Sequence, residues 1–359
     1  MSEPATRWIR AEVRALSAYH VPPAFDGIKL DAMENPYAWP GELSAAWQAR
    51  LADVAVNRYP DPQATALKQR LRATMGIARD AGLILGNGSD ELIQILALAV
   101  AGPETVVLAP GPSFVMYRMI AQFAGMRYVE VPLGENFELD LDAMLAAIAE
   151  HRPALTFLAW PNNPTGNLFA VRDVERIIEA SPGLVVVDEA YAPFAQTSLI
   201  GRAGRPDRLL VMRTLSKLGL AGLRLGYMAG DAALIGELDK LRLPYNINVL
   251  TQASADFALR HKAVFDAQTQ LIRDERGRLA AAIAAMAGVT VYPSEANFLL
   301  MRTPQGAATR WFRGLRDRGV LIKNLDGAHP LLHDCLRPTV GTPLENDALL
   351  TALAEVAGG

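Results

Sequence analysis

Short hydrophobic runs alternate with helical patterns between residues 83 and 230 of the chain. Hydrophobic residues occupy every position of the clearest run, residues 184–187. Unbroken runs of this length are typical of strands that are covered on both faces, as in a largely parallel sheet. The pattern therefore predicts an α/β fold with helices flanking the sheet. The strand candidates are residues 105–109, 127–131, 155–159, 184–187 and 209–212.

The pattern changes after about residue 231. Long alanine-rich helical stretches follow, notably residues 254–287, and then three short strand candidates at residues 297–301, 320–323 and 336–340. We expect a second, smaller domain here, and we expect the first 30 residues to pack with it. The predicted division is a large domain at 31–250, with 1–30 and 251–359 forming an N-terminal arm and a small C-terminal domain.

Composition and charge restrict the class of protein. The chain has 359 residues, 51% hydrophobic and 20% charged, which is enough to bury a large core. The formal net charge is -3 with both signs mixed along the sequence, so neither nucleic acid nor an anionic membrane is an expected partner. The longest hydrophobic stretches, 92–101 and 279–292, are shorter than the roughly 18 residues that span a bilayer. Cys335 is the only cysteine, so no disulfide forms within the chain and a cytoplasmic setting is expected.

Lys217 ends the most informative segment, residues 213–217, which directly follows a hydrophobic run. A lysine held at a strand end in a desolvated cleft has a lowered pKa, which frees its amine for Schiff-base chemistry. A lone lysine in such a place is more often a surface residue that closes a strand. The interpretation of Lys217 therefore depends on its neighbours.

Three further segments stand at the ends of predicted elements. Asp188 directly follows the run 184–187, at the end of a predicted strand, where open α/β sheets place their ligands. A buried carboxylate there needs a cationic partner such as a pyridinium nitrogen. Residues 161–166, Pro-Asn-Asn-Pro-Thr-Gly, predict a rigid turn that directs an asparagine side chain. Residues 86–91, Gly-Asn-Gly-Ser-Asp-Glu, precede a helical run whose free amide groups suit a phosphate. Taken singly, these segments are also typical of a helix cap or an ordinary loop.

Together and in this order, the four segments resemble the fold-type I pyridoxal-phosphate enzymes, and within them the class II aminotransferase branch that contains histidinol-phosphate aminotransferase. The likeness covers nearly the whole chain. It includes further segments at residues 29–37, 58–62, 244–248, 295–298 and 335–341. The resemblance implies a mainly parallel sheet flanked by helices, a smaller α+β domain, and pyridoxal 5'-phosphate as the cofactor.

The resemblance assigns roles around the cofactor ring. Lys217 would carry the cofactor as a Schiff base and move the proton between the substrate carbon and the cofactor. Asp188 would keep the ring nitrogen protonated, so that the ring accepts electrons from the substrate. Tyr191 and Asn163 match the residues that hydrogen-bond the phenolic oxygen, and Phe114 matches the residue stacked on the ring.

The resemblance also implies a phosphate site at the start of the helix that follows residue 88. Tyr59 matches a residue that reaches the phosphate of the neighbouring subunit, so the resemblance implies a homodimer with shared active sites. Within one chain, the backbone of Ser89 and Asp90 would contact the phosphate, and Ser216 and Arg224 would add charge-assisted bonds. Gly88 and Thr214 are the other cofactor-binding residues that the resemblance implies.

Four residues are assigned to the substrate by the same resemblance. Arg337 is similar to an anion clamp whose guanidinium suits the carboxylate of glutamate and the phosphate of histidinol phosphate in turn. Tyr19 is similar to a tyrosine on the substrate phosphate, with an aromatic anchor of the N-terminal arm as the alternative. Asn35, in the matching segment 29–37, is also assigned to the substrate. Lys323 stands where relatives often have a second arginine, so it is expected to supply a point charge with looser geometry.

The predicted activity is transamination between L-histidinol phosphate and 2-oxoglutarate, giving imidazole-acetol phosphate and glutamate in histidine biosynthesis. Two alternatives use the same scaffold, namely an aminotransferase for aromatic or other amino acids and a phosphothreonine-type decarboxylase. A non-catalytic binding protein is a third alternative, which the intact lysine, acid and arginine disfavour. His329 and His333 lack a surrounding ligand set apart from Asp334, so no metal site is expected.

Overall fold

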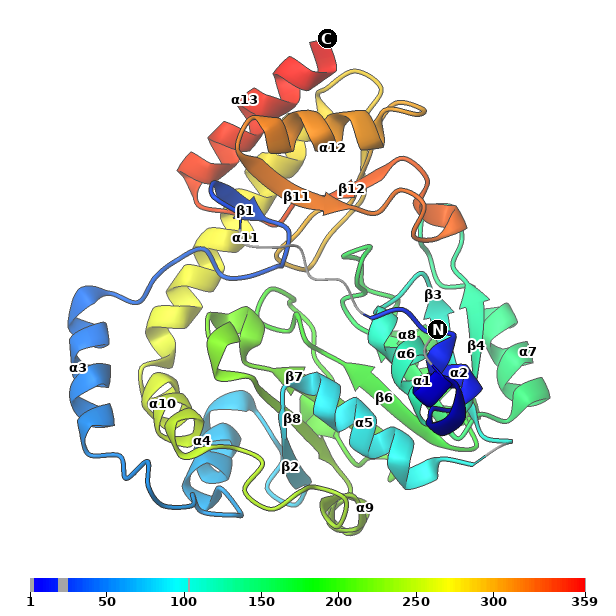
Figure 1. The fold of residues 1–359 in the computed structure, drawn as a ribbon, viewed down its shortest axis with the longest axis vertical. Helices are drawn as coiled ribbons and strands as arrows, with labels where there is room; N and C mark the ends of the chain where they lie inside the picture. Colours follow the sequence, from blue (N-terminus) through cyan, green and yellow to red (C-terminus); the bar gives the residue numbers. More distant parts are fainter. Residues whose placement is uncertain (1–2, 19–24, 103, 359) are drawn as a thin grey trace.

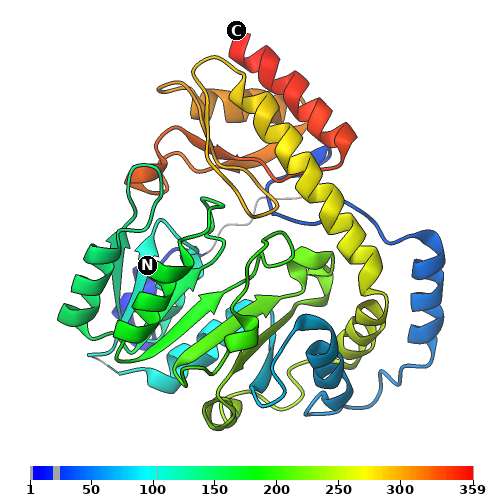
Figure 2. The same cartoon turned by 180° about the vertical axis from the view of Figure 1, so that it is seen from behind.

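The structure is a computed structural model that describes residues 3–18, 25–102 and 104–358. It consists of two regions of unequal size (Figure 1). Counted over these residues, the larger region contains a seven-stranded sheet and the smaller a five-stranded sheet. Figure 2 shows from behind that α11 (Lys262–Ala284) runs from the larger region into the smaller one. No helix in the described part of the chain is long and apolar enough to cross a membrane.

The large sheet has the strand order β2-β8-β7-β6-β5-β3-β4. Its strand β8 is antiparallel to both neighbours, whereas β7, β6, β5, β3 and β4 pair in parallel. The predicted α/β fold is confirmed, and all five predicted strands of this region are present, with two further strands, β2 and β8, beside them. The bounds are β2 (Gly82–Asn87), β3 (Val106–Gly111), β4 (Arg127–Pro132), β5 (Leu155–Ala159), β6 (Leu184–Asp188), β7 (Leu209–Thr214) and β8 (Leu225–Gly230).

Hydrophobic clusters on both faces explain the unbroken runs in these strands. Val185 and Val187 belong to one buried cluster and Val186 to another, because successive side chains of a strand point to opposite faces. Helices α5 (Ser89–Val100), α6 (Val115–Phe123) and α9 (Ala232–Asp239) bury their residues in the second cluster. The helices that bury residues in the first cluster are α3 (Gly41–Ala52), α4 (Thr65–Met75), α7 (Leu141–His151), α8 (Val171–Ala180) and α10 (Val249–Arg260).

The small sheet has the strand order β1-β11-β12-β10-β9. Its edge strand β1 comes from the beginning of the chain and pairs in parallel with β11, whereas the remaining pairs are antiparallel. The strands are β1 (Ile28–Leu30), β9 (Thr290–Val291), β10 (Met301–Arg302), β11 (Val320–Asn324) and β12 (Cys335–Arg337). They pack with α11 and with α12 (Ala308–Asp317) and α13 (Pro343–Gly358). The domain boundaries stay a prediction.

Three predicted elements of the small region differ from the structure. The helical stretch 254–287 is interrupted at His261, whose φ of −106° and ψ of 27° leave the helical range, so α10 and α11 are separate. The strand predicted at 297–301 is present only from Met301. Earlier in that range, Phe298 makes a single isolated bridge to Thr339, which does not extend into a ladder. The strand predicted at 336–340 ends at Arg337, since the following proline has no amide hydrogen for the ladder.

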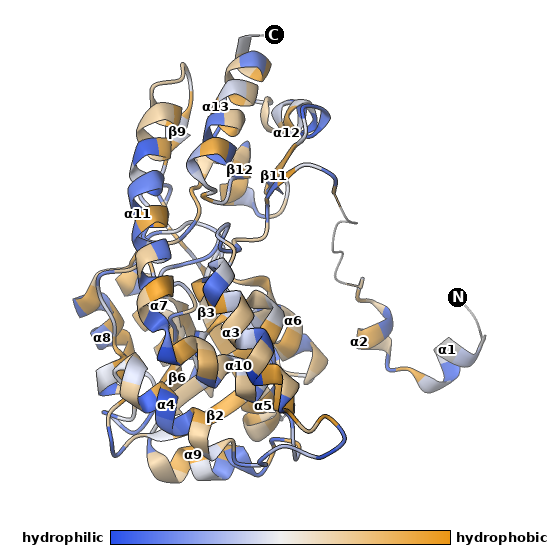
Figure 3. Ribbon diagram, turned by 90° about the vertical axis from the view of Figure 1, so that its left-hand side faces the viewer, coloured by the Kyte–Doolittle hydropathy of each residue, from blue (hydrophilic) through white to orange (hydrophobic). Residues whose placement is uncertain are grey.

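Short helices complete the described chain. At the N-terminus, α1 (Glu3–Trp8) and α2 (Ala11–Arg14) lie to one side of the body in Figure 3, and Arg10 donates a hydrogen bond of 2.7 Å to the carbonyl of Phe123 at the end of α6. Single turns are present at η1 (Ile200–Arg202), η2 (Ser216–Leu218), η3 (Ala221–Leu223) and η4 (Pro330–Leu332).

Candidate active site

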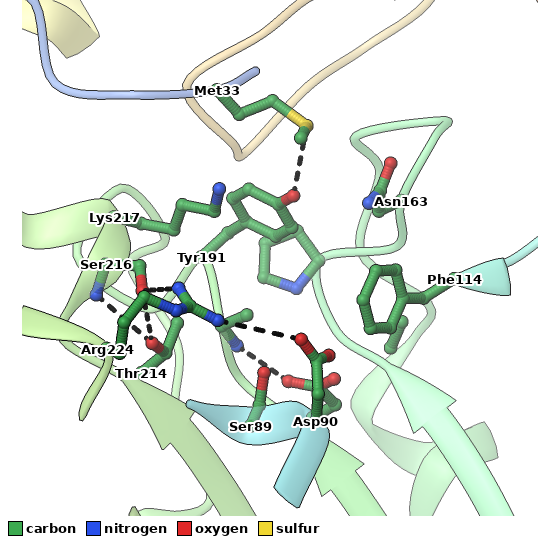
Figure 4. A pocket seen from close by; sticks show the side chains of 14 residues that line it. Met33, Ser89, Asp90, Phe114, Asn163, Tyr191, Thr214, Ser216, Lys217 and Arg224 are labelled. Carbon is green, nitrogen blue, oxygen red and sulfur yellow. Dashed lines mark hydrogen bonds and ion pairs between the residues drawn. The ribbon is translucent and has the colours of Figure 1, made fainter. Parts of the chain in front are cut away.

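A pocket lies at the carboxyl ends of β5, β6 and β7, where a parallel sheet presents its ligand-binding edge (Figure 4). Figure 4 shows the side chains of Lys217, Tyr191 and Asn163 converging on it from different elements. The structure therefore brings most of the predicted cofactor residues together. The pocket is lined by Met33, Ser89, Asp90, Phe114, Ala159, Pro161, Asn163, Asp188, Ala190, Tyr191, Thr214, Ser216, Lys217 and Arg224.

Asp188 ends β6 and is 4% exposed. Its Oδ2 accepts a hydrogen bond of 2.7 Å from the Tyr117 hydroxyl, and its Oδ1 accepts one of 3.0 Å from the Ala190 amide. Burial raises the pKa of Asp188 to about 6, and the two hydrogen bonds oppose that rise. Near neutral pH the carboxylate is mainly ionised, and a cation opposite it would stabilise it.

Lys217 lies in η2, just after β7. Its Nζ donates a hydrogen bond of 3.2 Å to the carbonyl of Ala32 and stands 5.9 Å from the centre of the Tyr191 ring. Burial, together with the nearby positive charge of Arg337, lowers the pKa of Lys217 to about 8. A substantial part of this amine is therefore neutral and nucleophilic near pH 8.

A group of donors surrounds the start of α5. Gly88 has a φ of +85°, and a Cβ there would stand 2.7 Å from the Nη2 atom of Arg224, so a side chain at this position would meet the guanidinium. The guanidinium lies 3.5 Å from the Ser216 hydroxyl and 3.7 Å from the Asp90 carboxylate. A helix start beside a guanidinium and hydroxyl groups is a site for an anion such as a phosphate.

The remaining predicted ring contacts also line the pocket. The Tyr191 hydroxyl donates to the sulfur of Met33 at 3.2 Å, and burial raises the pKa of Tyr191. Asn163 accepts a hydrogen bond of 2.5 Å from Arg337 through its Oδ1. Phe114 lies at the start of α6, edge-on to the ring of Tyr117 at 5.5 Å between centroids. An aromatic ring that carries a phosphate and a basic nitrogen fits these residues, since the pocket offers an apolar face, a buried acid and an anion site.

The predicted substrate residues are placed less uniformly. Arg337 is 6% exposed on β12 and, besides its bond to Asn163, donates to the carbonyl of Asp31 at 3.3 Å. Lys323 pairs directly with Arg337 in the antiparallel ladder of β11 and β12, so the two side chains project from the same face of the small sheet. Tyr19 lies outside the described residues.

Asn35 and Tyr59 do not line this pocket. The amide of Asn35 donates to the Leu218 carbonyl at 3.3 Å and to Gln268 at 3.0 Å, so it holds the loop after Lys217. Tyr59 is 80% exposed, with its ring stacked on that of Tyr245 at 4.4 Å between centroids. Its side chain is therefore available at the surface of this chain.

Two contacts in the site were missed by the sequence reasoning. Tyr117 holds Asp188 from α6, one helical turn after Phe114, and that spacing was a signal because residues three apart share a helix face. Met33 reaches the pocket from the segment before α3, which is far in the sequence from the other lining residues. No local pattern indicates such a contact, since it depends on how the two regions pack.

The chain belongs to the aminotransferase class I and II family, whose sequence profile matches residues 26–353. Within that family it is 58% identical over 347 residues to histidinol-phosphate aminotransferase 2 of Nitrosococcus oceani, covering 97% of this chain and 96% of the relative. It is 56% identical over 353 residues to histidinol-phosphate aminotransferase 2 of Cupriavidus pinatubonensis, with 97% and 96% covered. Histidinol-phosphate aminotransferase from Sinorhizobium meliloti, solved in complex with pyridoxal-5'-phosphate, matches with a TM-score of 0.87 at 25% identity, covering 98% of both chains.

Proposed function

We propose that the protein is a pyridoxal-phosphate-dependent aminotransferase that moves an amino group between L-histidinol phosphate and 2-oxoglutarate. The products are imidazole-acetol phosphate and glutamate, and the pathway is histidine biosynthesis. The observation that carries the proposal is the convergence of Lys217, Asp188 and Arg224 on one pocket. The family membership and the full-length similarity to histidinol-phosphate aminotransferases support it.

The residues on the sheet side of the pocket supply the proton chemistry. When bound, pyridoxal phosphate offers an aldehyde that condenses with amines and a ring that accepts an electron pair. Lys217 Nζ takes the proton from the substrate carbon that bears the amino group and later returns a proton. The Asp188 carboxylate keeps a facing nitrogen protonated, because a buried anion stabilises a cation beside it.

The hydrogen-bond donors of the pocket hold and orient the bound groups. The start of α5, Ser216 and Arg224 hold the phosphate of the cofactor, while Phe114 packs on its ring. Tyr191 and Asn163, which line the pocket, hydrogen-bond the oxygen of that ring.

Arg337 binds the anionic group that both substrates carry. Its guanidinium pairs with the carboxylate of glutamate in one half-reaction and with the phosphate of histidinol phosphate in the other. Lys323, opposite it in the ladder, adds a second positive charge for the doubly charged phosphate. One anion site therefore serves both half-reactions.

The active unit of the proposal is a homodimer in the cytoplasm. The exposure of Tyr59 supports this assembly, because an exposed side chain can reach the cofactor phosphate bound to the partner subunit. The small-molecule substrates require neither nucleic acid nor a membrane.

The proposal is tested by following the absorption of the bound cofactor in single half-reactions. The purified enzyme is mixed in turn with glutamate, histidinol phosphate, phenylalanine and phosphothreonine, and the products are identified. We expect glutamate and histidinol phosphate to react as amino donors and histidinol phosphate to be preferred over phenylalanine. A preference for phenylalanine, or the release of carbon dioxide from phosphothreonine, would contradict the assignment.

A further inference from the structure

Three consecutive residues, 31–33, cover the pocket on the side away from the large sheet, and we call them the covering segment. The carbonyl of Asp31 accepts from Arg337 at 3.3 Å, and the carbonyl of Ala32 accepts from Lys217 Nζ at 3.2 Å. The next residue, Met33, places its sulfur 3.2 Å from the Tyr191 hydroxyl. The segment thus contacts the reactive amine, the anion clamp and a ring contact in turn.

Met33 is the residue of the covering segment that lines the pocket. Figure 4 shows its side chain reaching from above toward Tyr191, opposite the strands that carry the acid and the phosphate site. The other two residues make their contacts to functional side chains through backbone carbonyls. The chemistry of this wall of the pocket is therefore set by one thioether side chain.

Two buried side chains of the small region fix the backbone of Met33. Its φ is +54°, in the left-handed region that residues other than glycine rarely adopt. The hydroxyl of Thr339 accepts from its amide at 3.0 Å, and the amide of Asn297 donates to its carbonyl at 2.9 Å. A residue keeps such a conformation only where its surroundings hold it there, and such residues gather at ligand sites.

A substrate must pass along this segment. Its amino-bearing carbon has to reach Lys217, and its anionic group has to reach Arg337, and the covering segment is hydrogen-bonded to both of these side chains. The lining opposite is polar or charged at most positions, whereas Met33 offers a polarisable sulfur, which makes favourable contacts with aromatic rings.

We propose that Met33 determines substrate specificity by contacting the planar ring of the amino donor, so that it favours ring-bearing substrates over glutamate. The inference rests on the proposed function for the identity of the natural donor, whose ring is an imidazole. The contact to glutamate is weaker, because its side chain presents no ring face to the sulfur.

The decisive measurement is the binding of two unreactive acids to the holoenzyme by calorimetry. 3-Phenylpropionate carries a ring and a carboxylate, and glutarate carries carboxylates alone. We expect Met33→Ala to weaken 3-phenylpropionate about tenfold, since about 1.4 kcal/mol of contact is lost, while glutarate changes less than about twofold. Met33→Leu, which keeps the bulk and removes the sulfur, should lie between wild type and Met33→Ala.

Two controls separate a ligand contact from a structural role. Met116→Ala removes the same side chain from α6 outside the pocket lining and should leave both affinities unchanged. The melting temperature and the cofactor absorption of each variant report whether the fold and the cofactor site are intact. Equal weakening of both acids in Met33→Ala, or no weakening of either, would overturn the proposal.

The same variants are then compared in half-reactions. We expect the half-saturating concentration of histidinol phosphate to rise about tenfold in Met33→Ala, with glutamate changed less than about twofold. A wild-type enzyme that reacts with glutamate but not with histidinol phosphate would refute the proposed function. The comparison of the two acids would still decide the role of Met33, because it does not use that substrate.

Discussion

The two halves of the proposed active site are built in different ways. The sheet-edge half, formed by Asp188, Lys217 and Arg224, comes from one stretch of chain that runs along neighbouring strands of the large sheet. The small-sheet half comes from the two ends of the chain. Met33 lines the pocket, whereas residues 31–32, Lys323 and Arg337 lie outside that lining. The first half lies at the ends of neighbouring strands and in the turns that follow them, whereas the second depends on how the small region packs against the large one.

Tyr191 stands where the two halves meet. It follows β6 of the large sheet, yet its ring is buried in the hydrophobic cluster of the small region, edge-on to Phe298 at 5.1 Å between centroids. The division of labour that we propose follows this boundary. The sheet-edge half holds the cofactor and moves protons, and the small-sheet half selects and binds the substrate.

Replacing Lys217 by alanine gives the largest expected effect and tests the sheet-edge half. Both half-reactions should slow by about 10³-fold or more, because the general base acts in each of them. Stopped-flow absorbance with glutamate and with histidinol phosphate measures the two rates, and the visible absorption of the bound cofactor should change as well. The matched control is Lys240→Ala, which removes an exposed lysine at the C-terminal end of α9. Slowing of only one half-reaction in Lys217→Ala would break the comparison.

Arg337→Ala tests the small-sheet half and should rank second. We expect KM to rise about 100-fold for both glutamate and histidinol phosphate, because a buried charge-assisted contact to each anion is lost. The cofactor should stay bound, as its absorption reports, although loss of the positive charge should raise the pKa of Lys217. Arg302→Ala, on β10 of the same sheet, is the control, since Arg302 instead donates to the carbonyl of Leu331 and lies over the ring of Tyr292. Loss of the cofactor from Arg337→Ala would show that the two halves are not separable.

Tyr117→Phe returns to the sheet-edge half with a smaller effect. The variant loses the hydroxyl that donates to Asp188 and lowers its pKa, so the pKa of this carboxyl should rise further above about 6. The carboxylate is then lost at a higher pH as the solution is acidified, and the acidic limb of kcat/KM should move upward in pH. At neutral pH we expect about a tenfold loss of activity, the value of one hydrogen bond to a charged group.

The control for this variant is Tyr128→Phe, because Tyr128 packs beside Arg118 rather than at the acid. Its pH profile should match the wild type. An acidic limb that does not move in Tyr117→Phe would contradict the role assigned to the hydroxyl.

Lys323→Ala carries the smallest expected effect and sharpens the comparison within the small-sheet half. A single partly exposed lysine contributes little to binding, so KM for histidinol phosphate should rise about threefold. Glutamate should change less, because its carboxylate carries one charge. Steady-state titration of each substrate measures the difference. Equal losses for both substrates would refute the assignment of Lys323 to the phosphate.

The same division explains what could be predicted from the sequence. Asp188 directly follows one hydrophobic run, and Lys217 ends the short segment that follows another. Because the carboxyl ends of parallel strands meet at one edge, their proximity was predictable. Strand β8 gave a weaker signal because Gly226 interrupts it. That glycine is required, since a Cβ there would stand 2.6 Å from the backbone of Gly88.

The small-sheet half was predicted less well, for a physical reason. Strands of two or three residues, such as β9 and β10, are too short to display a period. Asn35, in the matching segment 29–37, was assigned to the substrate. In the structure Met33 of that segment lines the pocket, while Asn35 donates to the carbonyl of Leu218 in the loop after Lys217. Which of these neighbours turns inward depends on Thr339 and Asn297, and no local rule connects them.

The position of β1 at the edge of the small sheet, paired with β11, has one more consequence. Ala32 follows the end of β1 by two residues, and Arg337 ends β12 of the same sheet. A tilt of that sheet would therefore move the carbonyl that accepts from the Lys217 amine together with the guanidinium of Arg337. In the function proposed above, docking an anion at Arg337 would therefore be coupled to release of the Lys217 amine.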